Sequence, residues 1–155
     1  MIDKIRTWAW QLKKVSKPAT FSNIVEYNLP HRIRRSAYTG WVNGFGLAAI
    51  QIGVPIRYAW FTLHGKEYEL INPKILDHFG TQTVSESCLS IPNKIFTVDR
   101  YYEIEYESLG RKFKAKGIKA QIIQHEIDHM DGILLKGKYE TLSKPSSSLG
   151  RSSKD

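Results

Sequence analysis

The sequence has a single cysteine, no long hydrophobic run and comparatively few acidic residues. Cys88 alone cannot form an intramolecular disulfide, so it is a core thiol, a reactive thiol or a metal ligand. No apolar stretch approaches the length that crosses a bilayer, and the start of the chain leads into the charged stretch "QLKK" rather than into an export cleavage site. We therefore expect a cytoplasmic protein that does not enter membranes.

The shortage of acidic residues leaves the chain basic, with 23 Lys and Arg residues against 15 Asp and Glu residues and a formal net charge of +8. This excess favours encounters with anionic surfaces such as RNA. It is spread over several short runs, however, and solvated basic faces are the simpler interpretation. The runs lie at residues 13–14, 31–35 and 111–116 and in the tail.

The length of 155 residues suits one domain with a sizeable core, and 41% hydrophobic with 25% charged residues are ordinary globular values. We assign residues 1–140 to a single folded domain. Residues 141–155 are polar and serine-rich and show no periodicity, so we expect them to be disordered.

Two β-hairpins are predicted by segments that alternate around short turns. Residues 57–63 and 68–72 flank the turn "HGKE", and residues 101–108 and 112–116 flank the turn "LGR". In the N-terminal part, the spacing of residues 5, 8 and 12 predicts a helix over residues 2–14. Beyond it we expect irregular chain or a short helix before Gly40.

The strongest helical pattern follows Gly117 and is ended by Gly132. One face of this helix carries two isoleucines and two histidines. Short strands around one late helix indicate an α+β fold, with small antiparallel or mixed β-sheets packed around the central helix. The residues of the face, at spacings of four, three and four, are Ile118, Ile122, His125 and His129.

The two histidines belong to the segment "HEIDH" and lie one helical turn apart, so they can bind one metal ion. Glu126, beside the first histidine, is close enough to act on a water molecule at that ion. Asp128 points elsewhere, and we assign it an outer role such as orienting an imidazole. The alternative is an exposed helix whose His and Glu side chains are only solvated.

A catalytic site of this kind needs a third protein ligand. Metzincin proteases place a histidine six residues after the second one, but Leu135 stands there, and the downstream Glu140 is not in a helical segment. The third ligand should therefore lie upstream. Cys88, in a turn-like patch of Ser and Glu, is the strongest candidate because a thiolate suits a transition metal. The other upstream candidates are His31, His64, His78 and Glu86.

Three segments, taken in order, resemble the peptide deformylase family: "GFGLAAIQ" at Gly44–Gln51, "ESCLS" at Glu86–Ser90 and "HEIDH" at His125–His129. The resemblance implies a metal-dependent hydrolase that removes the N-terminal formyl group from formyl-methionyl nascent polypeptides and releases formate. The implied cofactor is one divalent metal ion, usually ferrous iron, with nickel, cobalt or zinc as substitutes.

The resemblance also implies a role for each matching residue. Glu126 is the catalytic acid and base, and Gln51 with the backbone N–H of Leu89 donates to the formyl oxygen. The implied metal ligands are Cys88, His125 and His129.

A substrate groove is expected beside these residues. Gly44 and Gly46 would allow a peptide to approach as an added strand. Glu86 and Arg100 are expected as outer partners of the metal site. The methionine pocket is assigned to Phe45, Val84, Ile118 and Ile122, although such positions could equally be plain core.

The chain departs from the family at two places. Ser87 stands where the family has glycine, and it would alter the loop if that position required a positive φ. The chain also ends in a short serine-rich tail, whereas bacterial members often continue into a basic helix that contacts the ribosome. Docking by that route is not expected, although the family implies transient ribosome contact. We expect a monomer.

Three other functions fit parts of the pattern. A metallopeptidase or amidase that acts on another N-acyl group would share the metal centre. An RNA-binding module that has lost catalysis would account for the net charge. A structural zinc site would need a fourth protein ligand, which the sequence does not offer.

Overall fold

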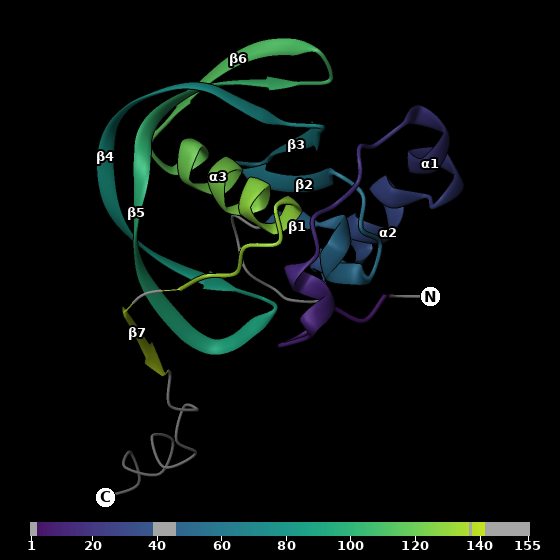
Figure 1. Ribbon diagram of the computed structural model, residues 1–155, viewed down its shortest axis with the longest axis horizontal. Helices are drawn as coiled ribbons and strands as arrows, with labels where there is room; N and C mark the ends of the chain where they lie inside the picture. Colours follow the sequence, from purple (N-terminus) through teal and green to yellow (C-terminus); the bar gives the residue numbers. More distant parts are fainter. Residues whose placement is uncertain (1–2, 39–45, 137, 142–155) are drawn as a thin grey trace, which may run out of the picture.

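The computed structural model describes residues 3–38, 46–136 and 138–141. Figure 1 shows helix α3 at the centre, with the long strands β4 and β5 curving around it and the strands β1, β2 and β3 on its other side. The predicted α+β fold, with small sheets around one helix, is confirmed. The elements in chain order are η1 (Trp10–Lys13), α1 (Phe21–Glu26), α2 (Leu29–Tyr38), β1 (Gly46–Ala48), η2 (Ala49–Ile52), β2 (Tyr58–Leu63), β3 (Lys66–Ile71), β4 (Lys74–Cys88), β5 (Ile91–Ser108), β6 (Arg111–Lys116), α3 (Ile118–Met130) and β7 (Lys138–Thr141).

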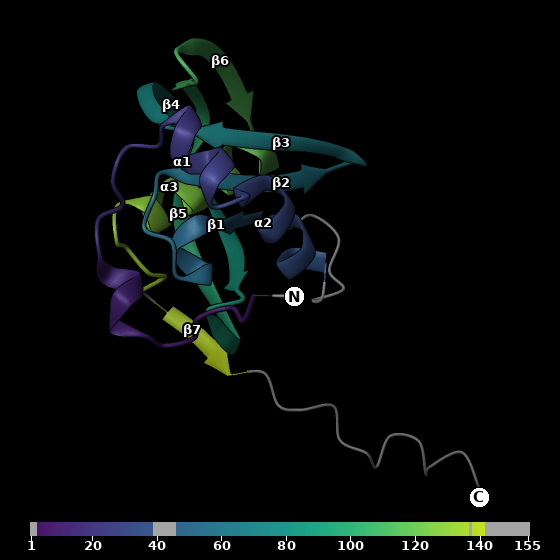
Figure 2. The same ribbon diagram turned by 90° about the vertical axis from the view of Figure 1, so that its right-hand side faces the viewer.

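The antiparallel sheet β1-β2-β3 separates two hydrophobic cores, because side chains alternate between the two faces of a strand. Ala59 and Phe61 pack with α3, whereas Tyr58 and Trp60 pack with the helices that precede Gly40. In that region α1 and α2 form where irregular chain or a short helix was expected, and Figure 2 shows both in front of the sheet with α3 behind it. Helix α2 contributes Leu29, Ile33 and Ala37 at a spacing of four.

The second sheet has β5 at its centre. Strand β4 pairs with one edge of β5 from Lys74↔Glu107 to Cys88↔Ile91, and β6 and β7 share the other edge. The hairpins β2-β3 and β5-β6 are the two that the sequence predicts. At the second turn, Leu109 and Gly110 both have positive φ, 52° and 71°, which matches a two-residue type I′ turn.

Cys88 ends a long strand, and the prediction that it lies in a turn-like patch is wrong. Along the end of β4, Ser85 and Ser87 are exposed while Glu86 and Cys88 are buried. The alternation is that of a strand, but the inward residues are polar because they belong to the site described below. A pattern based on hydrophobicity therefore missed this strand. A register irregularity between Glu86 and Cys88 separates the last pairs of the strand.

The helix predicted at the N-terminus is also wrong, apart from the short turn η1. The segment before η1 is held through its backbone by distant carbonyls: Arg6 N donates to Gln51 O at 2.7 Å and Trp8 N to Ser90 O at 3.1 Å. Trp8 has a positive φ of 51° and an exposed side chain. The three apolar residues at helical spacing therefore do not form one face, and the backbone donors serve other parts of the fold.

The predicted end of α3 is confirmed, and the predicted disordered tail is described only at its start. Helix α3 ends before Gly132, which has a φ of 75°, as predicted. Of the tail predicted to be disordered, Thr141 ends β7 and residues 142–155 lie outside the described residues. None of the helices that the structure describes has the length and hydrophobicity to cross a lipid bilayer.

Candidate metal centre

Three donor atoms meet where the end of β4 lies against α3. Cys88 Sγ is 3.3 Å from His129 Nε2, and His129 Nε2 is 3.1 Å from His125 Nε2. The three atoms all lie within 4.8 Å of one another. One thiolate and two imidazoles are ligands that divalent transition metals take in proteins. The residues that the sequence singles out as metal ligands thus form a candidate metal site.

A chain of polar contacts holds His125 from behind. Its Nδ1 lies 2.9 Å from Glu86 Oε1, which leaves Nε2 facing the other donor atoms. Arg100 donates to both oxygens of Glu86 at 2.8 and 2.7 Å and, through Nη1, to Asp128 Oδ2 at 2.6 Å. The expected outer residues Glu86, Arg100 and Asp128 therefore form one continuous network behind the site.

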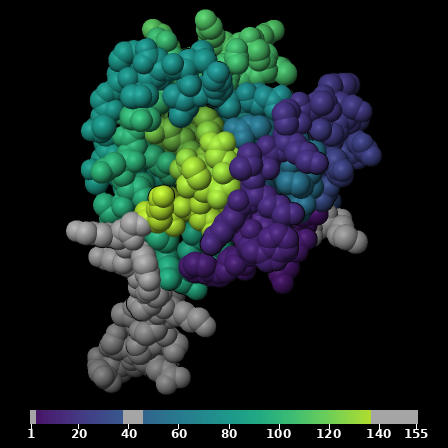
Figure 3. Space-filling view, in the orientation of Figure 1, coloured from purple at the N-terminus to yellow at the C-terminus, as the bar shows by residue number. Residues whose placement is uncertain are grey.

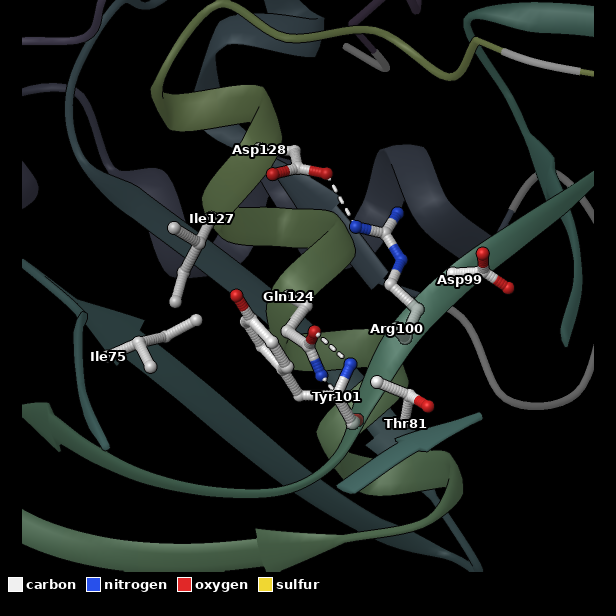
Figure 4. Close-up of a pocket in the computed structure, with 8 residues that line it drawn as sticks. All are labelled: Ile75, Thr81, Asp99, Arg100, Tyr101, Gln124, Ile127 and Asp128. Carbon is white, nitrogen blue, oxygen red and sulfur yellow. Dashed lines mark hydrogen bonds and ion pairs between the residues drawn. The ribbon is translucent and has the colours of Figure 1, made fainter. Parts of the chain in front are cut away.

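Figure 4 shows the outer end of this network, where Arg100 reaches from β5 to Asp128 on α3. Both residues line a cavity of about 320 Å³ between the sheet and the helix. Gln124 closes part of it by exchanging hydrogen bonds with the backbone of Tyr101, each 2.9 Å long. None of the three donor residues is among those that line this cavity, so it is separate from the metal centre.

The protonation of the two imidazoles fits a cation site. Burial and the neighbouring His125 hold the pKa of His129 well below its usual value, so His129 is neutral. Burial also disfavours a charge on His125, but contacts with Cys88 and Glu86 outweigh it and hold the pKa of His125 well above its usual value. The positively charged imidazole of His125 thus lies between Cys88 and Glu86, and a divalent cation bound at Nε2 would replace the proton on that nitrogen.

Glu126 lies beside the donor atoms and is 2% exposed. Burial raises the pKa of this carboxyl to about 7. Within the described part of the chain, its Oε2 has no hydrogen-bond partner. A carboxyl with this pKa can both accept and release a proton near neutral pH, which is what the predicted acid and base must do.

The side-chain amide of Gln51 is fixed at both of its ends. Its Oε1 accepts the backbone N–H of Ala48 at 2.9 Å, and this orients Nε2 toward Ser90 and Cys88. Nε2 donates to Ser90 Oγ at 3.0 Å and lies 3.8 Å from Cys88 Sγ. Leu89 follows Cys88 directly, in the turn between β4 and β5. Both predicted oxyanion donors therefore lie next to the candidate metal site.

Gly46 has a role that the sequence does not show. A Cβ built on Gly46 would lie 2.5 Å from Glu126 Oε1 and 3.2 Å from Glu126 Cγ. A side chain there would have to push the Glu126 carboxylate aside, so this glycine allows β1 to lie directly against the predicted acid and base.

The change Gly46→Ala is expected to lower the turnover that depends on Glu126 about 10- to 100-fold, because the new methyl group displaces the carboxylate of this predicted acid and base. Steady-state kinetics and circular dichroism together provide the measurement. The matched control is Gly65→Ala in the β2-β3 turn, where an added Cβ meets nothing within 4 Å but a φ of 77° adds local strain. Equal kinetic effects in both variants would contradict a specific role for Gly46.

The residues predicted to bind the substrate differ in burial, and two of them are not described by the structure. Gly44 and Phe45 lie outside the described residues. Val84 and Ile122 are half-buried, and Ile122 packs against the core around α3. Ile118, in the first turn of α3, is 54% exposed. Ser87 is in extended backbone rather than at a positive φ, so replacing the family's glycine does not strain the chain there.

The acid stability of the fold should depend on Glu86. Burial disfavours its charge, but hydrogen bonds from Arg100 and His125 outweigh burial and lower the pKa of Glu86 to about 2, below its ordinary 4.5. Because the folded-state pKa is the lower one, this stabilisation is complete above pH 4.5 and is lost as the pH falls toward 2. We expect Glu86→Gln to remove about 3 kcal/mol of the pH dependence in that range. Urea unfolding at pH 7 and at pH 2 measures it, and parallel losses in both proteins would contradict it.

Two contributions to the site were not predicted. Ser90 accepts the hydrogen bond that fixes Gln51, and the N-terminal segment binds the backbone carbonyls of both Gln51 and Ser90. Ser90 is fully buried and accepts bonds through both its side chain and its backbone carbonyl. The burial of a single serine cannot be read from the sequence, so this role could not be predicted.

Comparisons with known proteins give a consistent result. Residues 4–144 match the family model described as "Polypeptide deformylase". The chain is similar to the peptide deformylase of Symbiobacterium thermophilum, with 36% identity over 150 residues that cover 92% of this chain and 68% of that protein. It is 42% identical over 97 residues to the peptide deformylase of Syntrophomonas wolfei, a match that covers 59% of this chain and 64%, less than two thirds, of that protein. The crystal structure of a peptide deformylase from Legionella pneumophila has a TM-score of 0.78 and 31% identity, with coverage of 86% of this chain and 83% of that one.

Proposed function

Because the chain belongs to the polypeptide deformylase family, we propose that it hydrolyses the N-terminal formyl group of formyl-methionyl nascent peptides and releases formate. The single observation that carries this proposal is the buried Glu126 beside the cluster of Cys88, His125 and His129. A structural metal site would have no use for a carboxyl that can exchange protons at this place.

The residues present fit one divalent transition metal ion, because three suitable donor atoms converge and Glu86 orients the imidazole of His125. When bound, such an ion would lower the pKa of a water molecule and polarise the formyl carbonyl. We propose ferrous iron in the cell, with nickel, cobalt or zinc as substitutes. The thiolate supports a metal of this group and also predicts sensitivity to oxygen.

The protein side chains carry the protons and hold the reacting oxygen. Glu126 takes a proton from the attacking water as the new C–O bond forms, and it returns that proton to the peptide nitrogen as the C–N bond breaks. Formate and a peptide with a free N-terminal amine result. Gln51 Nε2 and the N–H of Leu89 donate to the oxygen that becomes negatively charged in between.

Removing the amide donor should be costly. We expect Gln51→Leu to lower kcat about 10²- to 10³-fold, with little change in KM, because the donor acts mainly in the transition state. Kinetics on a formylated tripeptide measure this effect. Gln121, which lies on α3 and contacts the carbonyl of Ser85 at 3.4 Å, offers a control in Gln121→Leu. If kcat/KM fell by the same factor because KM rose while kcat stayed unchanged, Gln51 would be assigned to substrate binding instead.

The direct test is formate release from a formyl-methionyl tripeptide by anaerobically prepared protein loaded with Fe²⁺ or Ni²⁺. Release supports the proposal, and a fully loaded protein that releases none contradicts it. An acetyl-methionyl tripeptide distinguishes the related class of amidases, because a pocket made for a formyl group rejects the larger acyl group.

The setting of the reaction is part of the same proposal. Nascent peptides carry the formyl group, so we propose a monomer in the cytoplasm that meets ribosomes transiently. The positive net charge of +8 supports encounters with such anionic particles.

A further inference from the structure

The fold neutralises the basic runs of the sequence to different extents. The run at residues 111–116 lies on β6, where its lysines face glutamates of β5 across the strand pair. Opposite charges at such positions attract one another, and Lys114 Nζ lies 3.4 Å from Glu105 Oε1. This run is therefore balanced inside the fold. The cross-strand pairs are Glu103 with Lys116, Glu105 with Lys114 and Glu107 with Lys112.

The run on α2 is also partly balanced. Arg32 forms a salt bridge of 2.8 Å with Asp3, and Arg34 forms one of 2.9 Å with Glu67. The charges of α2 thus have partners from the N-terminal end of the chain and from β3.

The N-terminal segment differs from both runs. Residues 4–25 contain no Asp or Glu. Five exposed cations lie between residues 4 and 17, and none of them forms a salt bridge with the residues that the structure describes. Clustered positive charge without acidic partners among the described residues indicates an anionic partner from outside. The five are Lys4, Arg6, Lys13, Lys14 and Lys17.

Two tryptophans stand among these cations. The side chains of Trp8 and Trp10 are 56% and 67% exposed. Lys94 Nζ lies 5.0 Å from the ring centre of Trp8, and Lys14 Nζ lies 4.9 Å from that of Trp10. Exposed aromatic rings next to cations are the combination that stacks nucleic-acid bases while neighbouring cations bind the phosphates.

The segment is held in place before any partner binds. Besides the bonds of Arg6 and Trp8, Ser16 N donates to Met130 O at 2.8 Å and Lys17 N to Pro55 O at 2.9 Å. Figure 3 shows the segment, in purple, lying across the face of the molecule beside the end of α3. A membrane surface would be met by an amphipathic helix, which these backbone bonds prevent here. The geometry therefore favours RNA over a lipid surface.

We propose that this N-terminal basic surface, formed by Lys4, Arg6, Trp8, Trp10, Lys13, Lys14 and Lys17, binds single-stranded RNA. The lysines and the arginine bind the phosphates, and the tryptophans stack on the bases. This activity is additional to deformylation and does not depend on it.

The charge arm of the test compares two double variants that remove the same charge at different places. Binding of a fluorescein-labelled oligouridylate of about 16 nucleotides is followed by anisotropy over a series of salt concentrations. Lys13→Gln with Lys14→Gln should weaken binding at least about tenfold and reduce the slope of log Kd against log salt by about 1.4. Lys112→Gln with Lys114→Gln should have a small effect. Equal weakening by both pairs, or no binding by the wild type, would overturn the proposal.

The stacking arm uses Trp8→Leu and Trp10→Leu, each expected to weaken RNA binding about fivefold or more. Phe21→Leu is the control, because Phe21 is 85% exposed on α1 but lies outside the surface. Unchanged binding in both tryptophan variants overturns the stacking. Binding to phosphatidylglycerol vesicles in preference to RNA overturns the proposal that RNA is the partner. Formate release from a free formylated tripeptide should be unchanged in the Lys13 and Lys14 double variant, so the two activities can fail independently.

Discussion

Replacement of Glu126 by glutamine is expected to lower kcat for formate release by about 10²- to 10⁴-fold while the metal content stays the same. Glutamine has nearly the same shape, so the buried site beside Gly46 remains filled. It cannot take a proton from water or return one to the departing nitrogen. The loss should therefore appear in kcat rather than in KM or in metal binding.

The measurement pairs steady-state kinetics with metal analysis of the same protein samples. Glu105→Gln on β5 is a suitable control, because it removes the same charge from a partly exposed pair away from the site. If the Glu126 variant kept its turnover, the proton would have to be carried by another group. If it lost its metal instead, Glu126 would have to be counted among the ligands.

Removal of Arg100 should have the largest effect on stability. Its side chain is 9% exposed, and it binds Glu86, which is 4% exposed. In Arg100→Leu, this nearly buried carboxylate loses its guanidinium and keeps only His125, and breaking a buried ion pair in this way typically costs about 3 to 5 kcal/mol of unfolding free energy. Because Glu86 also orients His125, metal affinity should fall about 10- to 100-fold as well.

Urea unfolding and competition with a metal chelator test the two parts of this prediction. Lys114→Ala breaks an ion pair whose lysine is 72% exposed, and it should cost less than about 1 kcal/mol. A similar small cost for Arg100→Leu would show that Glu86 finds another partner or becomes neutral. A stability loss with unchanged metal affinity would show that Arg100 does not help Glu86 to orient His125 for the metal.

The sequence was sufficient where spacing alone determines geometry. His125 and His129 are one turn apart on any helix, so their convergence follows from the motif. The position of Cys88 beside them followed from the family resemblance and from the choice of a soft ligand. The hairpins were predictable because alternation and turn residues are local signals.

The sequence was insufficient where long-range contacts determine the conformation. Strand β4 was hidden because its inward residues Glu86 and Cys88 are polar. The N-terminal helix failed because Arg6 and Trp8 donate to Gln51 and Ser90 across the molecule, and no local pattern encodes such bonds. The contact between Gly46 and Glu126 joins two segments in the same way.

The attachment of Ser16 to Met130 has a consequence for how the protein is made. A ribosome synthesises the N-terminal segment first, but the carbonyls that hold it emerge later, and the last of them belongs to the end of α3. The backbone N–H of Ser16 must therefore wait for its partner until almost the whole domain has been synthesised. Docking across such a separation along the chain closes slowly, so we expect this segment to dock last during folding.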